Sequence, residues 1–201
     1  MQKIVAKQAL TQNGWKANVE IGIEDGRIAF IQPASAGANP TVGLALPAPL
    51  NLHSHAFQRA MSGLTEARGP DPRDSFWTWR RLMYKFLDQL TPDQIQAIAA
   101  QVFLEMLEAG YSGVAEFHYL HHDAGGTPYA NLGELSERIV AAANDVGIGL
   151  TLLPVLYQFG GLDKRPLAGG QRRFGNDPDQ FARLHAGAAK AVMSGHGDYN
   201  I

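Results

Sequence analysis

The chain has 201 residues, of which 45% are hydrophobic and 18% charged, a composition unlike that of disordered proteins and a length ample for a hydrophobic core. Its 17 Lys and Arg against 19 Asp and Glu give a net charge of −2, which offers no electrostatic basis for binding nucleic acid or a membrane surface. Because cysteine is absent, disulfides, thiolate nucleophiles and iron–sulfur clusters are excluded, and any metal site must use histidine and carboxylate ligands.

The amino terminus shows no targeting signal. Residues 1–7 lack the apolar core and the small-residue cleavage site of a secretory signal peptide. No run of about 18 apolar residues occurs in the sequence, so we expect no segment that spans a bilayer. The sequence therefore predicts a soluble, cytoplasmic protein.

Short apolar runs separated by turn dipeptides dominate the first 46 residues. Asn13-Gly14 and Asp25-Gly26 favour the tight turns of hairpins, and Val19, Ile21 and Ile23 alternate as in a strand with one buried face. A stretch rich in Pro, Gly, Ala and Ser predicts a surface loop. We therefore predict a small antiparallel sheet in a domain of residues 1–46. Its strands are residues 4–6, 17–23 and 27–31, and the loop covers residues 33–43.

Beyond this sheet, apolar strands alternate with helical patterns, which is typical of parallel βα units. The clearest helix has Thr91 as its N-cap, Pro92 at its first position and Gly110 after its end. The predicted strands are residues 44–52, 112–118 and 148–156, and the predicted helices are residues 75–90, 91–109, 134–144 and 177–193.

Three βα units are too few for a closed barrel. A (β/α)8 barrel needs eight strands and typically about 250 residues. A small open sheet would satisfy the same pattern but would leave an unpaired inner edge, which is an aggregation liability. For residues 47–201 we therefore favour the first three units of an incomplete (β/α)8 TIM-type barrel, with a fourth strand beginning near Asp198.

His53-Ser54-His55 follows the first apolar strand of this second domain. Strand side chains alternate, so His53 and His55 point to one face and Ser54 to the other. Two imidazoles at the end of a buried strand are half of a typical zinc site. A bare His-x-His pattern is short enough to arise by chance. The carboxyl end of a barrel strand is nevertheless where such barrels place their active sites, which favours a metal pair.

Longer motifs around these histidines carry a resemblance to a known family. The chain resembles the amidohydrolase superfamily, whose members place a His-x-His metal pair on the first barrel strand, and within it the formimidoylglutamate deiminases. It departs from the family at Ala48, where glycine usually follows the proline. The segments that carry the resemblance are Asp25–Ile28, Leu46-Pro47, Asn51–Met61, Phe76–Arg80, Glu116–His122 and Gly170–Phe174.

The resemblance implies zinc-dependent hydrolysis of N-formimidoyl-L-glutamate to N-formyl-L-glutamate and ammonia, a step of histidine breakdown. His53 and His55 would hold one zinc ion, although histidine ligands also permit iron or manganese. The small-molecule substrate carries two carboxylates, which require cationic and hydroxyl donors. By the resemblance, Arg80 and Tyr119 bind substrate. Gln58, three residues after the metal pair, is a further candidate for substrate binding.

Other polar residues are predicted to be structural. We expect His121-His122-Asp123 to lie in an exposed loop rather than form a second metal cluster. The neighbouring Arg172 and Arg173 are expected to be solvated. Glu116 either enters the barrel or, as the favoured interpretation, forms a structural salt bridge, and the role of His118 is left open.

The expected metal ligands and acid/base residues are incomplete within 201 residues. In the family, the third zinc-binding histidine, an acid/base glutamate, another histidine and a metal-binding aspartate come from later strands. We therefore predict no catalytic acid/base residue within this chain and no activity for it alone, because catalytic zinc normally has three protein ligands. A homodimer or a complementing carboxyl-terminal portion is the expected protein partner.

Two alternatives remain on the sequence alone. The chain could belong to another amidohydrolase deaminase, acting on guanine, an adenosine derivative or a triazine, which would not need Arg80 and Tyr119 aimed at carboxylates. It could also be a non-catalytic α/β remnant in which the histidines are incidental.

Overall fold

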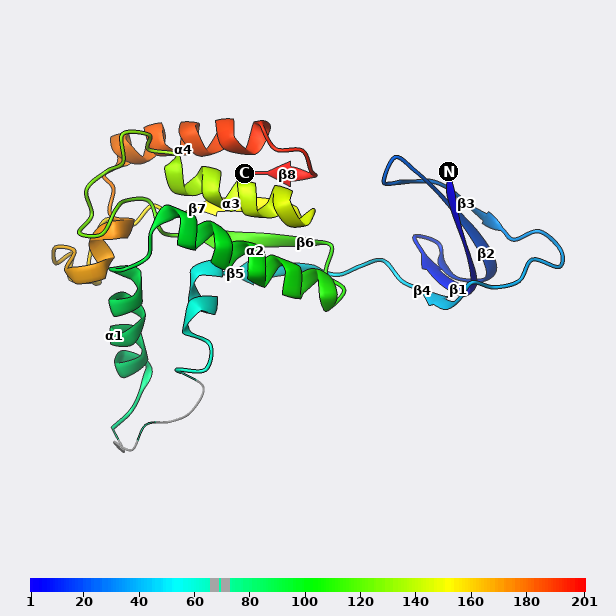
Figure 1. The fold of residues 1–201 in the computed structure, drawn as a ribbon, viewed down its shortest axis with the longest axis horizontal. Helices are drawn as coiled ribbons and strands as arrows, with labels where there is room; N and C mark the ends of the chain where they lie inside the picture. The colour runs from blue at the N-terminus through cyan, green and yellow to red at the C-terminus, as the bar shows by residue number, and fades with distance from the viewer. Residues whose placement is uncertain (66–68, 70–72) are drawn as a thin grey trace. The chain divides into compact units, whose positions relative to one another are not determined.

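A computed structural model describes residues 1–65, 69 and 73–201 (Figure 1). The chain divides into two compact units, Met1–Ala48 and Pro49–Ile201. Each unit has its own sheet and its own hydrophobic cluster.

Unit Met1–Ala48 is a four-stranded sheet in the order β3-β2-β1-β4. The predicted hairpin is confirmed, since Thr11 pairs with Gly14 and the turn uses the positive φ of 83° that glycine adopts readily. The prediction of a purely antiparallel sheet is wrong, because β4 pairs parallel to β1. Its strands are β1 (Gln2–Thr11), β2 (Gly14–Glu24), β3 (Arg27–Pro33) and β4 (Val42–Ala45).

There is an identifiable physical reason why strand β4 was not predicted. Only a Pro- and Gly-rich stretch separates it from β3, which favours a loop, and its last residues merge into the apolar run predicted as one strand, 44–52. Pairing with β1 gives its backbone groups partners, as at Ala6 opposite Val42. A tertiary contact thus decides the structure of this segment, and local pattern could not reveal it.

Unit Pro49–Ile201 contains a second four-stranded sheet in the order β5-β6-β7-β8, with every neighbouring pair parallel. The predicted alternation of strand and helix is confirmed, and a short fourth strand begins where the sequence indicated. The strands are β5 (Leu50–Ser54), β6 (Gly113–His118), β7 (Gly149–Pro154) and β8 (Tyr199–Asn200).

The helices of this unit follow their sequence signals closely. The Thr91 side chain accepts from the Gln94 amide, and a glycine in the left-handed region, Gly147, ends α3. None of the helices among the described residues has the length and apolarity needed to cross a membrane. They are α1 (Phe76–Leu87), α2 (Pro92–Glu108), α3 (Glu134–Val146) and α4 (Pro178–Met193), with 3-10 helices η1 (Ala56–Met61) and η2 (Gly169–Phe174).

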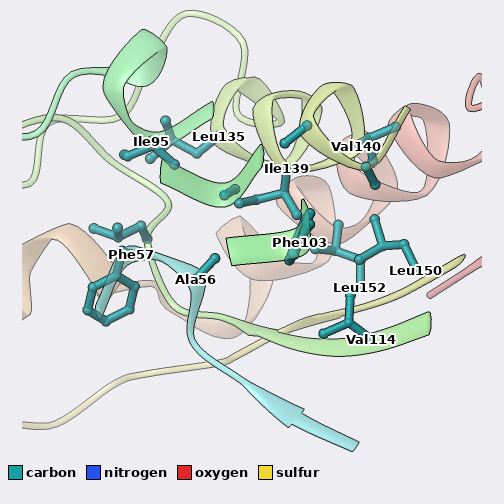
Figure 2. Close-up of a cluster of buried hydrophobic side chains, with 14 of the residues drawn as sticks. Ala56, Phe57, Ile95, Phe103, Val114, Leu135, Ile139, Val140, Leu150 and Leu152 are labelled. Carbon is teal, nitrogen blue, oxygen red and sulfur yellow. The ribbon is translucent and has the colours of Figure 1, made fainter. Parts of the chain in front are cut away.

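One face of the sheet packs on the helices to form the core. Figure 2 shows Val114 and Leu152 pointing from β6 and β7 toward Phe103 of α2 and Ile139 of α3, and all four are at most 3% exposed. Helices α2, α3 and α4 run alongside the strands, whereas α1 lies at the end toward which the strands point (Figure 1). The carboxyl ends of the strands therefore lie at the same end of the unit as η1 and α1.

Candidate metal and substrate site

The two histidines of the His-x-His motif face one another at the end of β5. The Nε2 atoms of His53 and His55 lie 3.1 Å apart. The pairing of β5 with β6 shifts register between Asn51 and Ser54, and the Asn51 side-chain oxygen accepts from the His53 amide at 3.1 Å. An irregular strand end, held by a side chain, therefore presents both rings to one side. The ring of His53 stacks on Phe117 of β6, with centroids 4.5 Å apart.

The hydrogen bonds of His55 determine which tautomer its ring adopts. Its Nδ1 lies 3.2 Å from the carbonyl oxygen of Phe117, and because a carbonyl can only accept, we assign the proton to Nδ1. Nε2 is then unprotonated and turned toward His53. Burial lowers the pKa of His55 below 6.5, which the Phe117 bond partly offsets, so the ring is neutral at pH 7. A neutral imidazole whose other nitrogen donates to a carbonyl is the usual form of a metal-binding histidine.

The residues present fit two positions of a metal site. Two Zn–N bonds of about 2.0–2.1 Å at a near-tetrahedral angle place their nitrogens roughly 3.1–3.4 Å apart, and the observed 3.1 Å agrees. Among residues 1–65, 69 and 73–201, no group of three or more His, Asp or Glu side chains could hold a metal. This part of the chain thus offers a pair of ligands rather than a full set.

A cavity of about 430 Å³ next to His55 brings together the other candidates. His55, Gln58, Arg80 and Tyr119 all line it, although they come from three separate segments of the sequence. Tyr119 also packs edge-on against His55, with centroids 5.3 Å apart. The remaining walls are mainly aromatic and apolar, formed by Phe57, Phe76, Trp79, Met83, Tyr84, Tyr157 and Phe174.

Arg80 is held in this cavity by neutral groups. Its Nε donates to the Tyr84 hydroxyl at 3.1 Å and one terminal nitrogen donates to the Tyr157 hydroxyl at 3.2 Å. Burial raises the pKa of Tyr84, which therefore remains uncharged at pH 7. No carboxylate in the described part of the chain forms an ion pair with Arg80. A fixed cation without an anionic partner, set in an aromatic cavity, is suited to binding an anionic ligand.

The loop after β7 completes the support of Arg80. Gln171 of η2 lies 3.4 Å from the Tyr157 hydroxyl and also contacts the carbonyl oxygen of Gly160. A Cβ on Gly170 would come within 2.6 Å of the Tyr84 ring, so only glycine lets η2 approach α1 this closely. Tyr84 and Tyr157 are functional residues that were not predicted from the sequence. The spacing of four between Arg80 and Tyr84 could have indicated the first, whereas the second requires the fold.

Several polar residues lie in surroundings that differ from those predicted from the sequence. The prediction of an exposed loop at His121 and His122 is wrong, since each is 1% exposed. Their Nε2 atoms bond to backbone carbonyl oxygens, at 3.1 Å to Val155 and 2.8 Å to Gly175. Such bonds satisfy buried loop backbone, which a composition-based argument cannot foresee.

The solvation of the arginine pair is confirmed for one residue and wrong for the other. Arg172 is exposed, but Arg173 has no exposed surface and donates to the carbonyl oxygens of His122, Leu87 and Leu90. Adjacent residues of a short 3-10 helix point in different directions, so one is solvated while its neighbour is buried.

Glu116 lies on the helix-packed face of the sheet, not on the face predicted to line a barrel, and forms no salt bridge with any described residue. It alternates with Ala115 and Phe117 and shares its face with Val114, which belongs to the helix-packed core. His118 lies on this face too and is 3% exposed. Burial raises the pKa of Glu116 to about 7 and lowers that of His118 well below 6.5.

The chain is similar to known proteins over most of its length. Residues 1–41 match the family described as formimidoylglutamate deiminase HutF, N-terminal domain. The chain is 54% identical over 187 residues to the formimidoylglutamate deiminase of Pseudomonas aeruginosa, covering 92% of this chain and 41% of that protein. A crystal structure of an amidohydrolase from Brucella melitensis superposes with a TM-score of 0.88 at 48% identity, covering 100% of this chain and 45% of that one.

A more distant structure shares the fold alone. Atrazine chlorohydrolase of Arthrobacter aurescens, solved in complex with zinc, is 18% identical with a TM-score of 0.71, covering 100% of this chain and 46% of that one. The chain thus spans less than half the length of each of these relatives. The predicted resemblance to the amino-terminal part of formimidoylglutamate deiminases, among the amidohydrolases, is confirmed.

Proposed function

We propose that this chain is the amino-terminal part of a zinc-dependent enzyme that hydrolyses N-formimidoyl-L-glutamate to N-formyl-L-glutamate and ammonia. The single observation that carries the proposal is Arg80, a cation held by two phenols in the cavity that His55 also lines. A linear substrate with carboxylates at one end and a reacting carbon at the other matches this arrangement. The 54% identity to a formimidoylglutamate deiminase supports this substrate over a guanine or a triazine.

The residues of the cavity would divide the work between binding and positioning. Arg80 would bind a substrate carboxylate through charge-assisted hydrogen bonds. Tyr119 and Gln58, which line the same cavity, would donate hydrogen bonds that orient the substrate beside His55. The aromatic walls would exclude water from competing for these polar groups, which strengthens each of them.

His53 and His55 would hold the zinc ion through their Nε2 atoms. When bound, zinc would supply the lowering of a water pKa toward neutrality that makes water a nucleophile at neutral pH. Because two ligands are too few for a catalytic zinc site, we propose that the remaining ligands and the acid/base residue belong to protein outside residues 1–201. The parallel sheet β5-β6-β7-β8 would then be the start of a (β/α)8 barrel whose remainder closes the site.

The decisive experiment uses a chimera in which this chain replaces the matching amino-terminal part of the Pseudomonas aeruginosa deiminase. We expect the chimera to release ammonia from formimidoylglutamate but not from guanine, and the 201-residue chain alone to release none. A double substitution of His53 and His55 by Ala should abolish release, whereas His196→Ala, at an exposed position, should not. A cooperatively folding chimera that is inactive on formimidoylglutamate, or active on guanine, would refute the proposal.

A further inference from the structure

Glu116 is a buried acid in a core that is otherwise mainly apolar. Its side chain is 1% exposed, and no cation of the described residues pairs with it. A buried carboxyl without a charged partner destabilises a fold unless other interactions compensate. Its presence on the helix-facing side of β6 therefore requires an explanation in terms of what it binds.

The Glu116 carboxyl contacts the residues on both sides of His55. Its Oε1 accepts from the backbone amide of Ala56 at 2.7 Å. Ser54 pairs with Glu116 in the sheet register, and its side chain, beside the same carboxyl, lowers the pKa of that carboxyl. Glu116 thus holds the backbone immediately after a metal-ligand candidate and lies beside the side chain immediately before it.

Regular sheet bonding cannot hold this part of β5. Asn51 pairs with Val114 and Ser54 with Glu116, so three steps on β5 face two steps on β6. The extra residue on β5 interrupts the backbone ladder, as in a β-bulge. Side chains take over from the ladder on both sides of the interruption, Asn51 at the amide of His53 and Glu116 at the amide of Ala56.

We propose that Glu116 is a positioning residue for the metal pair. By holding the Ala56 amide beside the paired Ser54, it sets the backbone of His55 so that Nδ1 meets the Phe117 carbonyl and Nε2 faces His53. The same strand then supplies both the carboxyl that holds the backbone and, one residue later, the carbonyl that orients the ring. This inference rests on the proposed function for its purpose, but the orientation of His55 can be measured without metal.

Matched variants separate positioning from simple structural support. Glu116→Leu removes the hydrogen bonds at similar volume, while Glu116→Gln retains an acceptor oxygen for the Ala56 amide. Glu108→Leu makes the same change at an exposed position at the end of α2 and serves as the control. Ser54→Ala removes the hydroxyl beside the carboxyl, keeps the bond to the Ala56 amide, and provides a milder test should Glu116→Leu fail to fold.

The measurement is side-chain ¹H–¹⁵N NMR of the histidines in the 201-residue chain, first without metal and then during titration with Zn²⁺ alone. In wild type and Glu116→Gln we expect His55 protonated at Nδ1, and Zn²⁺ shifts at both His53 and His55. In Glu116→Leu we expect mixed His55 tautomers and a Zn²⁺ affinity at least about tenfold lower, typical of losing a ligand-orienting group. Ser54→Ala should show a smaller change in the same direction.

Each other outcome has a definite meaning. A folded Glu116→Leu, or Ser54→Ala if that variant does not fold, with the wild-type His55 tautomer would overturn the inference. Equal loss in Glu116→Gln and Glu116→Leu would also overturn it, because charge rather than hydrogen-bond geometry would then matter. If wild type itself shows no Zn²⁺ response at His53 and His55, the pair does not bind zinc in this chain and the proposed function is decided by the chimera, while the metal-free tautomers still decide the role of Glu116.

Discussion

The Nε of Arg173 donates to the carbonyl oxygen of His122 at 2.9 Å, within the interior of the second unit. The same guanidinium donates to the carbonyl oxygens of Leu87 and Leu90, at and after the end of α1. One side chain from η2 therefore ties the segment after β6 to the end of α1. These segments flank the cavity that holds Arg80 and Tyr119, so the arginine supports the walls of the site.

Arg173→Met should destabilise the fold by about 3 kcal/mol or more, because several buried carbonyl groups lose their donor at once. The matched control is Arg172→Met at the exposed neighbouring position, which should stay within about 0.5 kcal/mol of wild type. Urea unfolding of the 201-residue chain, followed by circular dichroism, measures both. Equal stability of the two variants would contradict the buried role of Arg173.

Arg80→Ala in the chimera should raise KM for formimidoylglutamate by about ten- to a hundredfold, since hydrogen bonds to charged groups are worth about 1.5–3 kcal/mol. Arg81→Ala, on the exposed side of the same helix, should leave KM within about twofold. Tyr157→Phe removes one support of the guanidinium and should give a smaller rise, about fivefold for a neutral hydrogen bond. Steady-state ammonia release decides, and an unchanged KM in Arg80→Ala would rule out carboxylate binding there.

Periodicity and capping signals were sufficient to predict most helices and strands of the second unit. Thr91 begins α2 through a local hydrogen bond, Pro92 suits its first position through a fixed φ, and Gly110 follows its end. The apolar runs of β6 and β7 indicate parallel strands. The structure of β4 depends instead on a partner strand more than thirty positions earlier, as in the pairing of Ala6 with Val42. Long-range pairing of this kind leaves little local trace.

The candidate site likewise contains residues that could be predicted from the sequence and residues that could not. His53 and His55 could be predicted because strand alternation places them on one face. Motif resemblance indicated Arg80 and Tyr119, and closeness in sequence to the metal pair indicated Gln58. The residues that hold these groups were not predictable in the same way. Tyr157 supports Arg80 from 77 positions away and Glu116 binds Ala56 from 60 positions away. A hydrogen bond between such distant residues exists only after the chain has folded.

Zn²⁺ should raise the unfolding temperature of the 201-residue chain, because an ion that binds only the native state stabilises it by mass action. At ten times the dissociation constant the gain is about 1.4 kcal/mol, or roughly 3–6 °C for a unit of this size. A chelator should reverse the shift, and His55→Ala should abolish it, while exposed His196→Ala retains it. A thermal transition that ignores both zinc and chelator would favour a non-catalytic role for the histidines.

Stability should depend on pH in opposite senses through Glu116 and the buried histidines. Burial raises the pKa of Glu116 from 4.5 to about 7, so its stabilising contribution is present below pH 4.5 and is lost as pH rises through about 7. Burial lowers the pKa of His118 well below 6.5 and that of His121 to about 4, so their contribution is present above pH 6.5 and is lost as pH falls. In wild type, the fall in stability with pH caused by Glu116 therefore opposes the rise caused by the histidines between about pH 4.5 and 6.5.

Glu116→Gln removes the pH dependence of stability that Glu116 causes and retains the one that the buried histidines cause. The stability of this variant should therefore rise more steeply with pH than that of wild type, and relative to wild type it should gain up to about 3 kcal/mol between pH 4.5 and 7.5. Urea unfolding at half-unit pH intervals measures the difference, with Glu108→Gln at an exposed position as the control. Parallel stability curves for wild type and Glu116→Gln would show that the carboxyl titrates alike in the folded and unfolded chain, against the raised pKa that its burial implies.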